Sequence, residues 1–294
     1  MIQNSHDDRV GKAVAWLMLG VVGGLLLDLC AKELLRTYSL PQFVLLRSLI
    51  AIAILLTIAP RFGGLRSLRT NEKAWHFLRT ILAIGAMFGF FYGLSKMPLV
   101  NALTLGYTAP LMMTALSAIF LKDPVGWRRW SAVTIGFVGV LIMLRPSDRD
   151  LSLPAIAVLV AAFCYACQAI TARKLSATES TLSLSFYVVV GPMVVSLGLI
   201  DNHNWLYPDL IGWALLIGAG ASSVTAWIGF VNGYRAASPA LLAPLEYTAL
   251  VGGAIAGYLI WDEIPDRWVA VGALIIVASG LFVVYRSKEV SEET

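Results

Sequence analysis

Charged side chains are scarce in this chain. Asp, Glu, Lys and Arg make up 14% of the 294 residues, against about 25% in an ordinary soluble domain. Hydrophobic residues make up 58%, and the polar residues are gathered between apolar runs of roughly membrane-spanning length. These runs are apolar around nearly the whole helix circumference, whereas helices on a soluble core keep a polar face. The sequence therefore predicts an all-α integral membrane protein with almost no room for a soluble domain.

Motifs for enzymatic chemistry are also missing from the sequence. No G-x-x-x-x-G-K-[ST] loop is present, which argues against ATP-driven transport by this chain. Of the three cysteines, Cys30, Cys164 and Cys167, the last two lie at i and i+3 with no other Cys or His nearby, so they do not predict a metal site. No Ser-His-Asp arrangement is evident. We therefore expect free thiols, no enzyme activity, no cofactor and no metal. The net charge of +4 reflects loop orientation rather than nucleic-acid binding.

Ten apolar runs of spanning length divide the chain, and they carry Gly, Pro and single polar residues that neighbouring helices can accommodate. They lie at about 13–34, 42–60, 75–95, 99–121, 127–144, 153–175, 181–200, 210–234, 238–261 and 268–285. The predicted organisation is a cytoplasmic tail at 1–11, a first five-helix repeat at 12–144, a linker at 145–152, a second five-helix repeat at 153–286 and a cytoplasmic tail at 287–294.

A short motif occurs twice, about 140 residues apart. Tyr107-Thr108-Ala109 recurs as Tyr247-Thr248-Ala249. Each copy is followed by an apolar run that stops at an acidic residue, Asp123 in one case and Glu263 in the other. Internal repeats in a strongly apolar chain are typical of transporters built from two halves.

Lys and Arg are distributed unevenly between the two sides of the predicted membrane. With the N-terminus inside, the inner segments carry fourteen of the 22 and the outer loops carry six, while Arg47 and Arg79 lie inside span ends. The excess marks the cytoplasmic side. We therefore expect a protein of the bacterial inner membrane with both termini in the cytoplasm. Because each half has five spans, an odd number, the second half enters the membrane in the opposite sense. The sequence thus predicts ten transmembrane helices as two inverted five-helix repeats.

Several motifs resemble the EamA-type family of the drug/metabolite transporter superfamily, over about residues 12–286. The strongest stretch runs from Met97-Pro98-Leu99 through Tyr107-Thr108-Ala109-Pro110 and Arg128-Arg129-Trp130 to Gly136-Phe137-Val138-Gly139, and Phe43-x-x-x-Arg47 and Ala243-Pro244-Leu245-Glu246-Tyr247-Thr248 add to it. The usual Gly-Glu after the fourth and ninth spans is replaced here by Lys122-Asp123 and Asp262-Glu263. These departures argue against a site role for the loop acids.

The resemblance implies two five-helix repeats and transport of a small molecule. The family includes exporters of amino acids and importers of compounds similar to S-adenosylmethionine or flavins, and the YddG-type aromatic amino-acid exporters are the analogy we draw. We expect a secondary transporter that exports an amino acid by alternating access, and the analogy extends this to aromatic amino acids. The alternative is an importer of a cofactor-like metabolite, and a channel or a membrane enzyme is a third possibility. We expect a monomer whose partners are a small-molecule substrate, membrane lipid and, as one option, a coupled proton.

Ionisable residues inside the predicted spans are functional candidates because a charge in hydrocarbon is costly. Asp28 and Lys32 lie at i and i+4 in the first span, where they could form an ion pair that holds the helix. Alternatively, Asp28 faces the cavity as a substrate or proton site. Glu246 lies in the ninth span beside Pro244, which weakens the helix. It could serve the central site or gating, or make an interhelical hydrogen bond. For Arg47 a structural partnership with a carboxylate or with helix carbonyls is favoured.

Aromatic and polar residues could line a cavity for an amphiphilic solute, which needs apolar walls and a few orienting polar groups. Each aromatic residue has packing in the helix bundle as its alternative role. The candidates are Tyr107, Tyr247, Trp227, Tyr165 and Gln168. Pro110 and Pro244 are candidate hinges, and Gly85, Gly89 and Gly93 provide a small-residue face for close helix packing.

Overall fold

The computed structural model describes residues 2–62, 64–120, 126–144, 152–175, 178–236 and 245–292. All regular secondary structure in these ranges is helical. The main helices are α1 (Ile2–Thr37), α2 (Leu40–Ile58), α3 (Lys73–Lys96), α4 (Leu99–Gly106), α5 (Ala109–Phe120), α6 (Trp127–Leu144), α7 (Leu153–Leu175), α8 (Thr181–Leu199), α9 (Leu210–Ala236), α11 (Thr248–Trp261) and α12 (Arg267–Glu292). The predicted tails are therefore helical in part, because α1 begins at Ile2 and α12 continues to Glu292.

Seven helical segments in the described ranges are long and apolar enough to cross a membrane, which makes this a multi-pass membrane protein. They are Gly11–Thr37, Leu40–Arg61, Lys73–Lys96, Leu99–Phe120, Leu153–Ala172, Leu182–Leu199 and Leu210–Phe230. Three shorter apolar helices, Trp130–Leu144, Thr248–Trp261 and Arg267–Phe282, occupy the remaining predicted runs. The count of ten spans stays a prediction, as does the inverted arrangement of the two halves.

The outer faces of the bundle are apolar. Leu26, Leu259 and Leu274 are large apolar side chains that remain exposed, Leu259 over 73% of its surface. In water a belt of this kind would favour aggregation, whereas lipid tails solvate it without cost. Exposed apolar residues thus support the same conclusion as the span lengths.

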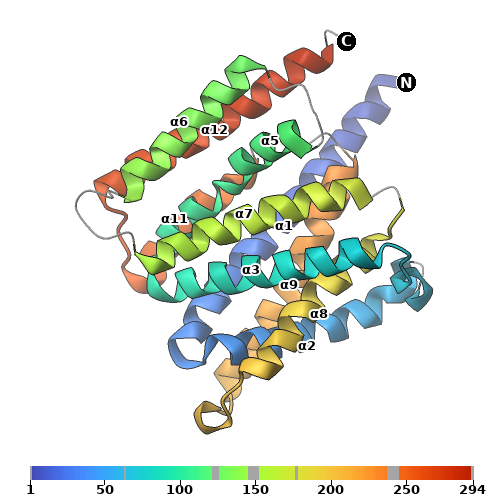
Figure 1. The fold of residues 1–294 in the computed structure, drawn as a ribbon, viewed down its shortest axis with the longest axis vertical. Helices are drawn as coiled ribbons and strands as arrows, with labels where there is room; N and C mark the ends of the chain where they lie inside the picture. Colours follow the sequence, from blue (N-terminus) through green and yellow to red (C-terminus); the bar gives the residue numbers. More distant parts are fainter. Residues whose placement is uncertain are drawn as a thin grey trace.

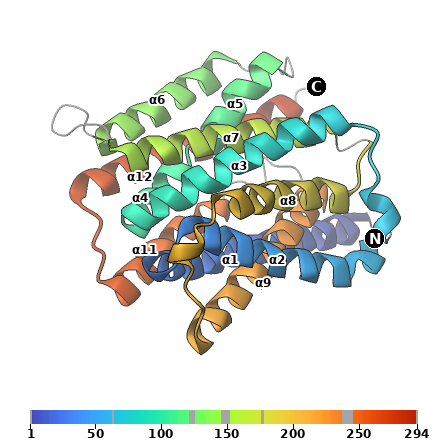
Figure 2. The same cartoon turned by 60° about the horizontal axis from the view of Figure 1, so that its bottom comes forward.

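Helices from the two predicted halves pack in pairs. In Figure 1 α6 lies beside α12 at one edge of the bundle, while α2 and α8 lie toward the opposite edge. Figure 2 again shows α6 at one edge of the bundle, far from α2. Between these edges α1 packs along α9 and α3 packs along α7. Every pair combines one helix from the first half with one from the second, so the interior of the protein is an interface between the halves.

Small residues allow the closest of these contacts. A Cβ atom added at Gly89 of α3 would lie 2.6 Å from the carbonyl oxygen of Ala157 on α7, and one at Gly85 would lie 2.9 Å from Cys164 Sγ. A larger side chain at either position would push α3 away from α7. The small-residue face predicted on the third span is therefore confirmed as a packing surface.

The fourth predicted span is not one continuous helix. The structure interrupts it after Gly106, so that α4 and α5 are separated by Tyr107 and Thr108. Pro110 follows directly in the first turn of α5, where its missing N–H costs nothing because that group has no intrahelical partner. Pro110 thus helps to start a new helix after the break.

Candidate functional site

The repeated Tyr-Thr-Ala motif forms the same local structure in both halves. The Thr108 hydroxyl donates to the Leu105 carbonyl at 2.6 Å, and the Thr248 hydroxyl donates to the Leu245 carbonyl, also at 2.6 Å. Tyr107 ends α4, and its counterpart Tyr247 lies in the turn that precedes α11. Both tyrosines are therefore located where a helix is interrupted. The Tyr107 N–H still donates to the Leu103 carbonyl and the Thr108 N–H to the Leu105 carbonyl, so this interruption is a tight turn. Interrupted helices of this kind occur at the solute sites of transporters.

The fold brings the two interruptions together. The rings of Tyr107 and Tyr247 lie 5.5 Å apart between centroids, with an interplanar angle of 41°. Tyr107 is also within electrostatic range of Asp28 on α1, Tyr165 on α7 and Glu246. We refer to Asp28, Tyr107, Tyr165, Glu246 and Tyr247 as the central group. Four of the residues proposed from sequence thus lie within electrostatic range of a fifth, Tyr107, and the five come from both halves.

Most members of the central group are partly exposed. Tyr165 is exposed over 41% of its surface, although it lies within electrostatic range of Tyr107 and Glu246. Asp28, Tyr107 and Glu246 are each partly exposed, while Tyr247 is buried. Polar groups on facing elements could line a solute site.

Arg47 approaches this group from α2. Asp28 and Arg47 interact electrostatically, and the Arg47 guanidinium lies 5.9 Å from the ring centroid of Phe91. Phe43, one turn before Arg47, packs edge-on against the same ring at 5.1 Å. The Phe43-x-x-x-Arg47 motif therefore places both side chains on one helix face against Phe91.

Lys32 pairs with a different acid from the one that its sequence spacing suggests. Its ammonium forms an ion pair with Glu263 at 2.5 Å and donates to the Met97 carbonyl at 3.2 Å. Glu263 also accepts the backbone N–H of Leu99, the first residue of α4, at 2.8 Å. The predicted ion pair between Asp28 and Lys32 is therefore wrong. Lys32 pairs instead with Glu263, which is 231 residues away in sequence but closer in space than Asp28.

The backbone before Glu263 sets its direction. Asp262 adopts a left-handed conformation with φ of 53° after α11, and the Glu263 N–H donates to the Gly257 carbonyl at 3.0 Å. This is a helix-ending turn in which glycine is usual. It folds the chain back so that Glu263 reaches Lys32 and Leu99. The sequence argued against a site role for Glu263, and this residue does lie outside the central group. It joins the two halves at one end of the bundle, which we call the Lys32 end.

A second polar cluster joins the halves at the other end of α3. Glu179, between α7 and α8, accepts the hydroxyls of Thr70 at 2.6 Å and Ser183 at 2.8 Å, and its carboxylate lies 3.1 Å from His76 Nε2. Burial raises the pKa of Glu179, but these hydrogen bonds and the nearby His76 outweigh it and hold the pKa below its ordinary value. We call this the Glu179 end. None of its members was proposed as functional from sequence, because Thr70, His76 and Glu179 share no motif.

Other residues proposed from sequence lie apart from the central group. Gln168 is buried on α7, and its carbonyl accepts a hydrogen bond from Arg79 at 2.7 Å. Trp227 lies on α9 beside Ala226, whose backbone approaches Gly23 of α1. In the described ranges no hydrogen bond or ring contact joins either residue to the tyrosine pair, so their place in the cavity stays a prediction. Pro244, Asp123 and most of the predicted linker 145–152 lie outside the described residues.

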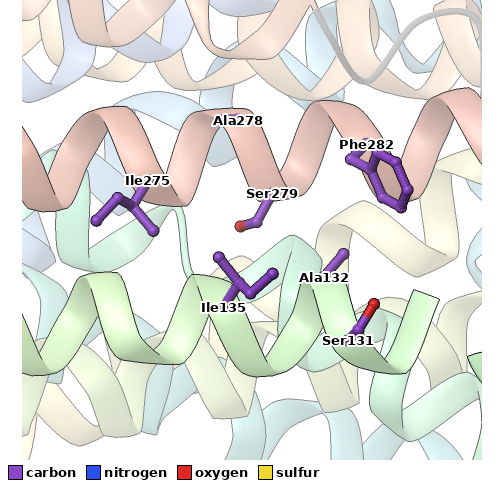
Figure 3. A pocket seen from close by; sticks show the side chains of 7 residues that line it. All are labelled: Ser131, Ala132, Ile135, Ile275, Ala278, Ser279 and Phe282. Carbon is purple, nitrogen blue, oxygen red and sulfur yellow. The ribbon is translucent and has the colours of Figure 1, made fainter. Parts of the chain in front are cut away.

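A hollow of about 320 Å³ opens between α6 and α12, and no member of the central group lines it. Figure 3 shows Ile135 of α6 and Ser279 of α12 pointing toward each other across it. The hydroxyls of Ser279 and Ser131 both donate to carbonyls of their own helices. The remaining lining is apolar, so this hollow suits a hydrocarbon chain better than a polar solute.

Comparison with known proteins agrees with this architecture. The model of the EamA-like transporter family matches residues 11–145 and 152–285, nearly the whole chain in two copies. The chain belongs to the EamA-like transporter family. The two matched segments coincide with the two halves that contribute to the central group. This EamA-like protein is accordingly a transporter with a small-molecule substrate, and nothing in the family points to an enzyme.

Among the similar proteins, three are named for the compound that they transport. The chain is 30% identical to the S-adenosylmethionine uptake transporter of Rickettsia bellii (strain RML369-C), over 94% of either chain. It is 29% identical to the riboflavin transporter of Vibrio cholerae, over 91% of either chain. Against the pseudopaline exporter CntI of Pseudomonas aeruginosa, the identity is 25% over 84% of this chain and 87% of the exporter.

A crystal structure of another protein supports the fold. It superposes on this EamA-like transporter with a TM-score of 0.69 at 16% identity, covering 95% of this chain and 99% of the other. At this identity the likeness concerns the fold alone.

Proposed function

We propose that this EamA-like transporter is a secondary transporter that carries a ring-bearing metabolite through the central group by alternating access. The observation that carries the proposal is the pair of helix interruptions at Tyr107 and Tyr247, which meet at 5.5 Å. Transporter sites with inverted repeats are commonly built from discontinuous helices of this kind. Tyr107, Tyr165 and Tyr247 would provide aromatic surface, and Asp28 and Glu246 the charged groups.

The packing of the halves fits two copies related by a two-fold axis, which the proposed inverted arrangement also requires. If α1 corresponds to α7 and α3 to α9, the pair α1–α9 maps onto the pair α7–α3, and both pairs are present. Polar clusters joining the halves occur at both ends of α3, at Lys32 and at Glu179. Alternate opening of these two ends would expose the central group first to one side of the membrane and then to the other.

For the substrate we favour import of a cofactor-like metabolite over export of an amino acid. The two relatives of higher identity are named for S-adenosylmethionine uptake and for riboflavin, and both compounds carry flat ring systems that tyrosines can stack on. Export stays the second candidate, since a relative at 25% identity is named as an exporter.

We further propose a bacterial inner-membrane location with both termini in the cytoplasm. Fourteen of the 22 Lys and Arg residues fall in the segments that this orientation places inside. Membrane lipid would fill the hollow between α6 and α12, and we expect a monomer. An alkaline phosphatase fusion after Thr294 that is active in the periplasm would reverse this orientation.

The function is tested with purified protein in liposomes. Saturable flux of radiolabelled S-adenosylmethionine or riboflavin, with counterflow from preloaded vesicles, is the expected result, and sided assays separate import from export. Flux that does not saturate would indicate a channel instead. Matched liposomes containing a Tyr107→Ala, Tyr247→Ala variant should show flux reduced at least about tenfold, since both aromatic walls are removed.

A further inference from the structure

We propose that Asp28 and Arg47 bind a zwitterionic α-amino acid group of the substrate, with Asp28 taking the ammonium and Arg47 the carboxylate. The proposal rests on the proposed function, because it names the chemical group that the central group would hold.

Asp28 and Arg47 carry opposite charges at one place without touching. The two side chains interact electrostatically across α1 and α2. They nevertheless form no ion pair within 4.0 Å, although both belong to the described residues. An acid and a guanidinium held apart in this way stabilise each other only weakly, so a third group between them could satisfy both.

The Arg47 guanidinium is poorly satisfied by the protein. Arg47 is only 3% exposed, yet the hydrogen bonds that it forms go to Ser48 Oγ at 3.4 Å and Met87 Sδ at 3.1 Å, both from Nη2. Its Nε is buried with no partner. Its Nη1 also lacks a partner among the described residues but is not sealed from solvent. A guanidinium of this kind has donors in the fork geometry that a carboxylate accepts.

Arg79 shows what a structural arginine in this fold looks like. It is as buried as Arg47 and its Nε also lacks a partner, but Nη1 donates to the Gln168 carbonyl at 2.7 Å and Nη2 to the Leu184 carbonyl at 3.4 Å. These bonds tie α3 to α7 and α8. Because Arg47 lacks any such carbonyl, helix packing alone does not explain its position.

Asp28 provides the complementary half of the site. It is partly exposed, and its carboxylate accepts no hydrogen bond from the described residues. It lies within electrostatic range of Tyr107, which places the two charges beside the aromatic part of the central group. A metal cation or a simple anion would neutralise one charge and leave the other. A zwitterion satisfies both, and its side chain could extend toward the tyrosines.

The first test uses the unmodified protein and needs no variant. S-adenosylmethionine is compared with decarboxylated S-adenosylmethionine, and tryptophan with tryptamine, by inhibition of flux or by thermal shift. We expect removal of the carboxylate to weaken binding by about 30-fold or more, as for loss of one partner of a buried charge pair. Equal binding of both members in each pair would overturn the proposal.

Variants then assign the two charges. Arg47→Gln should weaken S-adenosylmethionine about 30-fold while leaving its decarboxylated form within about twofold, and Asp28→Asn should weaken both forms, because both carry the ammonium. Arg79→Gln is the matched control, expected to lower the unfolding temperature without changing the ratio of the two affinities. An Arg47→Gln variant that weakens both forms alike would overturn the assignment. If that variant does not fold, the comparison in the unmodified protein still decides.

Failure of this inference can be told from failure of the proposed function. Saturable transport of riboflavin, with no binding of S-adenosylmethionine or tryptophan, would overturn the zwitterion site and leave the transporter proposal standing. Absence of saturable flux for every probe would overturn both.

Discussion

The hydroxyl of Tyr247 lies against Gly280 of α12. A Cβ atom added at Gly280 would overlap this hydroxyl, and the hydroxyl itself is buried without a hydrogen-bond partner in the described part of the chain. The missing side chain at Gly280 is therefore what allows the Tyr247 ring to lie where it meets Tyr107. One glycine of α12 thus determines the position of a residue in the central group.

This relationship predicts the behaviour of a pair of substitutions. Gly280→Ala should destabilise the protein by about 1–3 kcal/mol through overpacking and should reduce transport by displacing the Tyr247 ring. Tyr247→Phe removes the overlapping oxygen, so the double variant should regain part of the lost stability. Thermal unfolding in detergent measures both effects. Tyr247→Phe alone should be neutral or stabilising by about 1 kcal/mol, because it removes a buried unsatisfied hydroxyl. Additive effects of the two substitutions would contradict the contact.

Accessibility of the central group can be measured by cysteine labelling. After replacement of the native cysteines Cys30, Cys164 and Cys167, which are free thiols, single cysteines at Tyr165 and Tyr107 should react with a polar thiol reagent. Substrate should protect both positions. A cysteine at Leu99, which is fully buried, provides an unreactive control. If cysteines at Tyr165 and Tyr107 fail to react in a transport-competent protein without substrate, these side chains are packed in the helix bundle rather than lining a cavity.

Glu246 is predicted to serve turnover rather than folding. Glu246→Gln keeps the shape and the hydrogen-bonding capacity of the side chain but cannot titrate. The variant should purify as a single species and bind substrate, yet lose the pH dependence of transport, as measured by flux at several pH values. An unchanged rate and pH profile would mean that Glu246 does not carry a coupled proton, and Asp28 would become the next candidate.

The Lys32–Glu263 ion pair is predicted to hold the Lys32 end closed. Lys32→Met and Glu263→Gln should each increase labelling of a cysteine placed in the central group from that side of the membrane. A double-mutant cycle should give a coupling energy of about 1–3 kcal/mol, since the two side chains are only 9% and 20% exposed. The exposed Arg36–Glu33 pair is a matched control with an expected coupling below about 1 kcal/mol. Coupling near zero for Lys32 and Glu263 would rule out this role.

The stability of the folded protein should fall at low pH because of Glu179. Because the folded protein lowers the pKa of Glu179 below its ordinary 4.5, the unfolded chain takes up a proton first as the pH falls. The stabilisation is therefore complete above about pH 4.5 and is lost as the pH drops below that value through the folded pKa. Thermal unfolding of the wild type and of Glu179→Gln across this range measures the effect. Parallel pH curves for the two proteins would contradict it.

Much of the fold followed from the sequence because the membrane makes secondary structure a local property. In lipid an apolar run has no water to bond its backbone N–H and C=O groups, so it forms a helix that satisfies them internally. The close packing of Gly85 and Gly89, which the structure confirms, was predictable from their spacing alone. The break within the fourth span was less evident. The sequence suggested Pro110 as a hinge, but only the structure shows that α4 ends at Gly106 and that Tyr107 and Thr108 separate it from α5.

The repeated Tyr-Thr-Ala motif and the family membership were determined by the sequence alone, since both are properties of residue order. Which charges meet was decided by the tertiary structure. Lys32 had an acid one turn away at Asp28, yet it pairs with Glu263, because the turn at Asp262 folds that carboxylate onto it. Electrostatic attraction acts through distance in space, and helices that pack across the two halves set those distances for residues far apart in the chain.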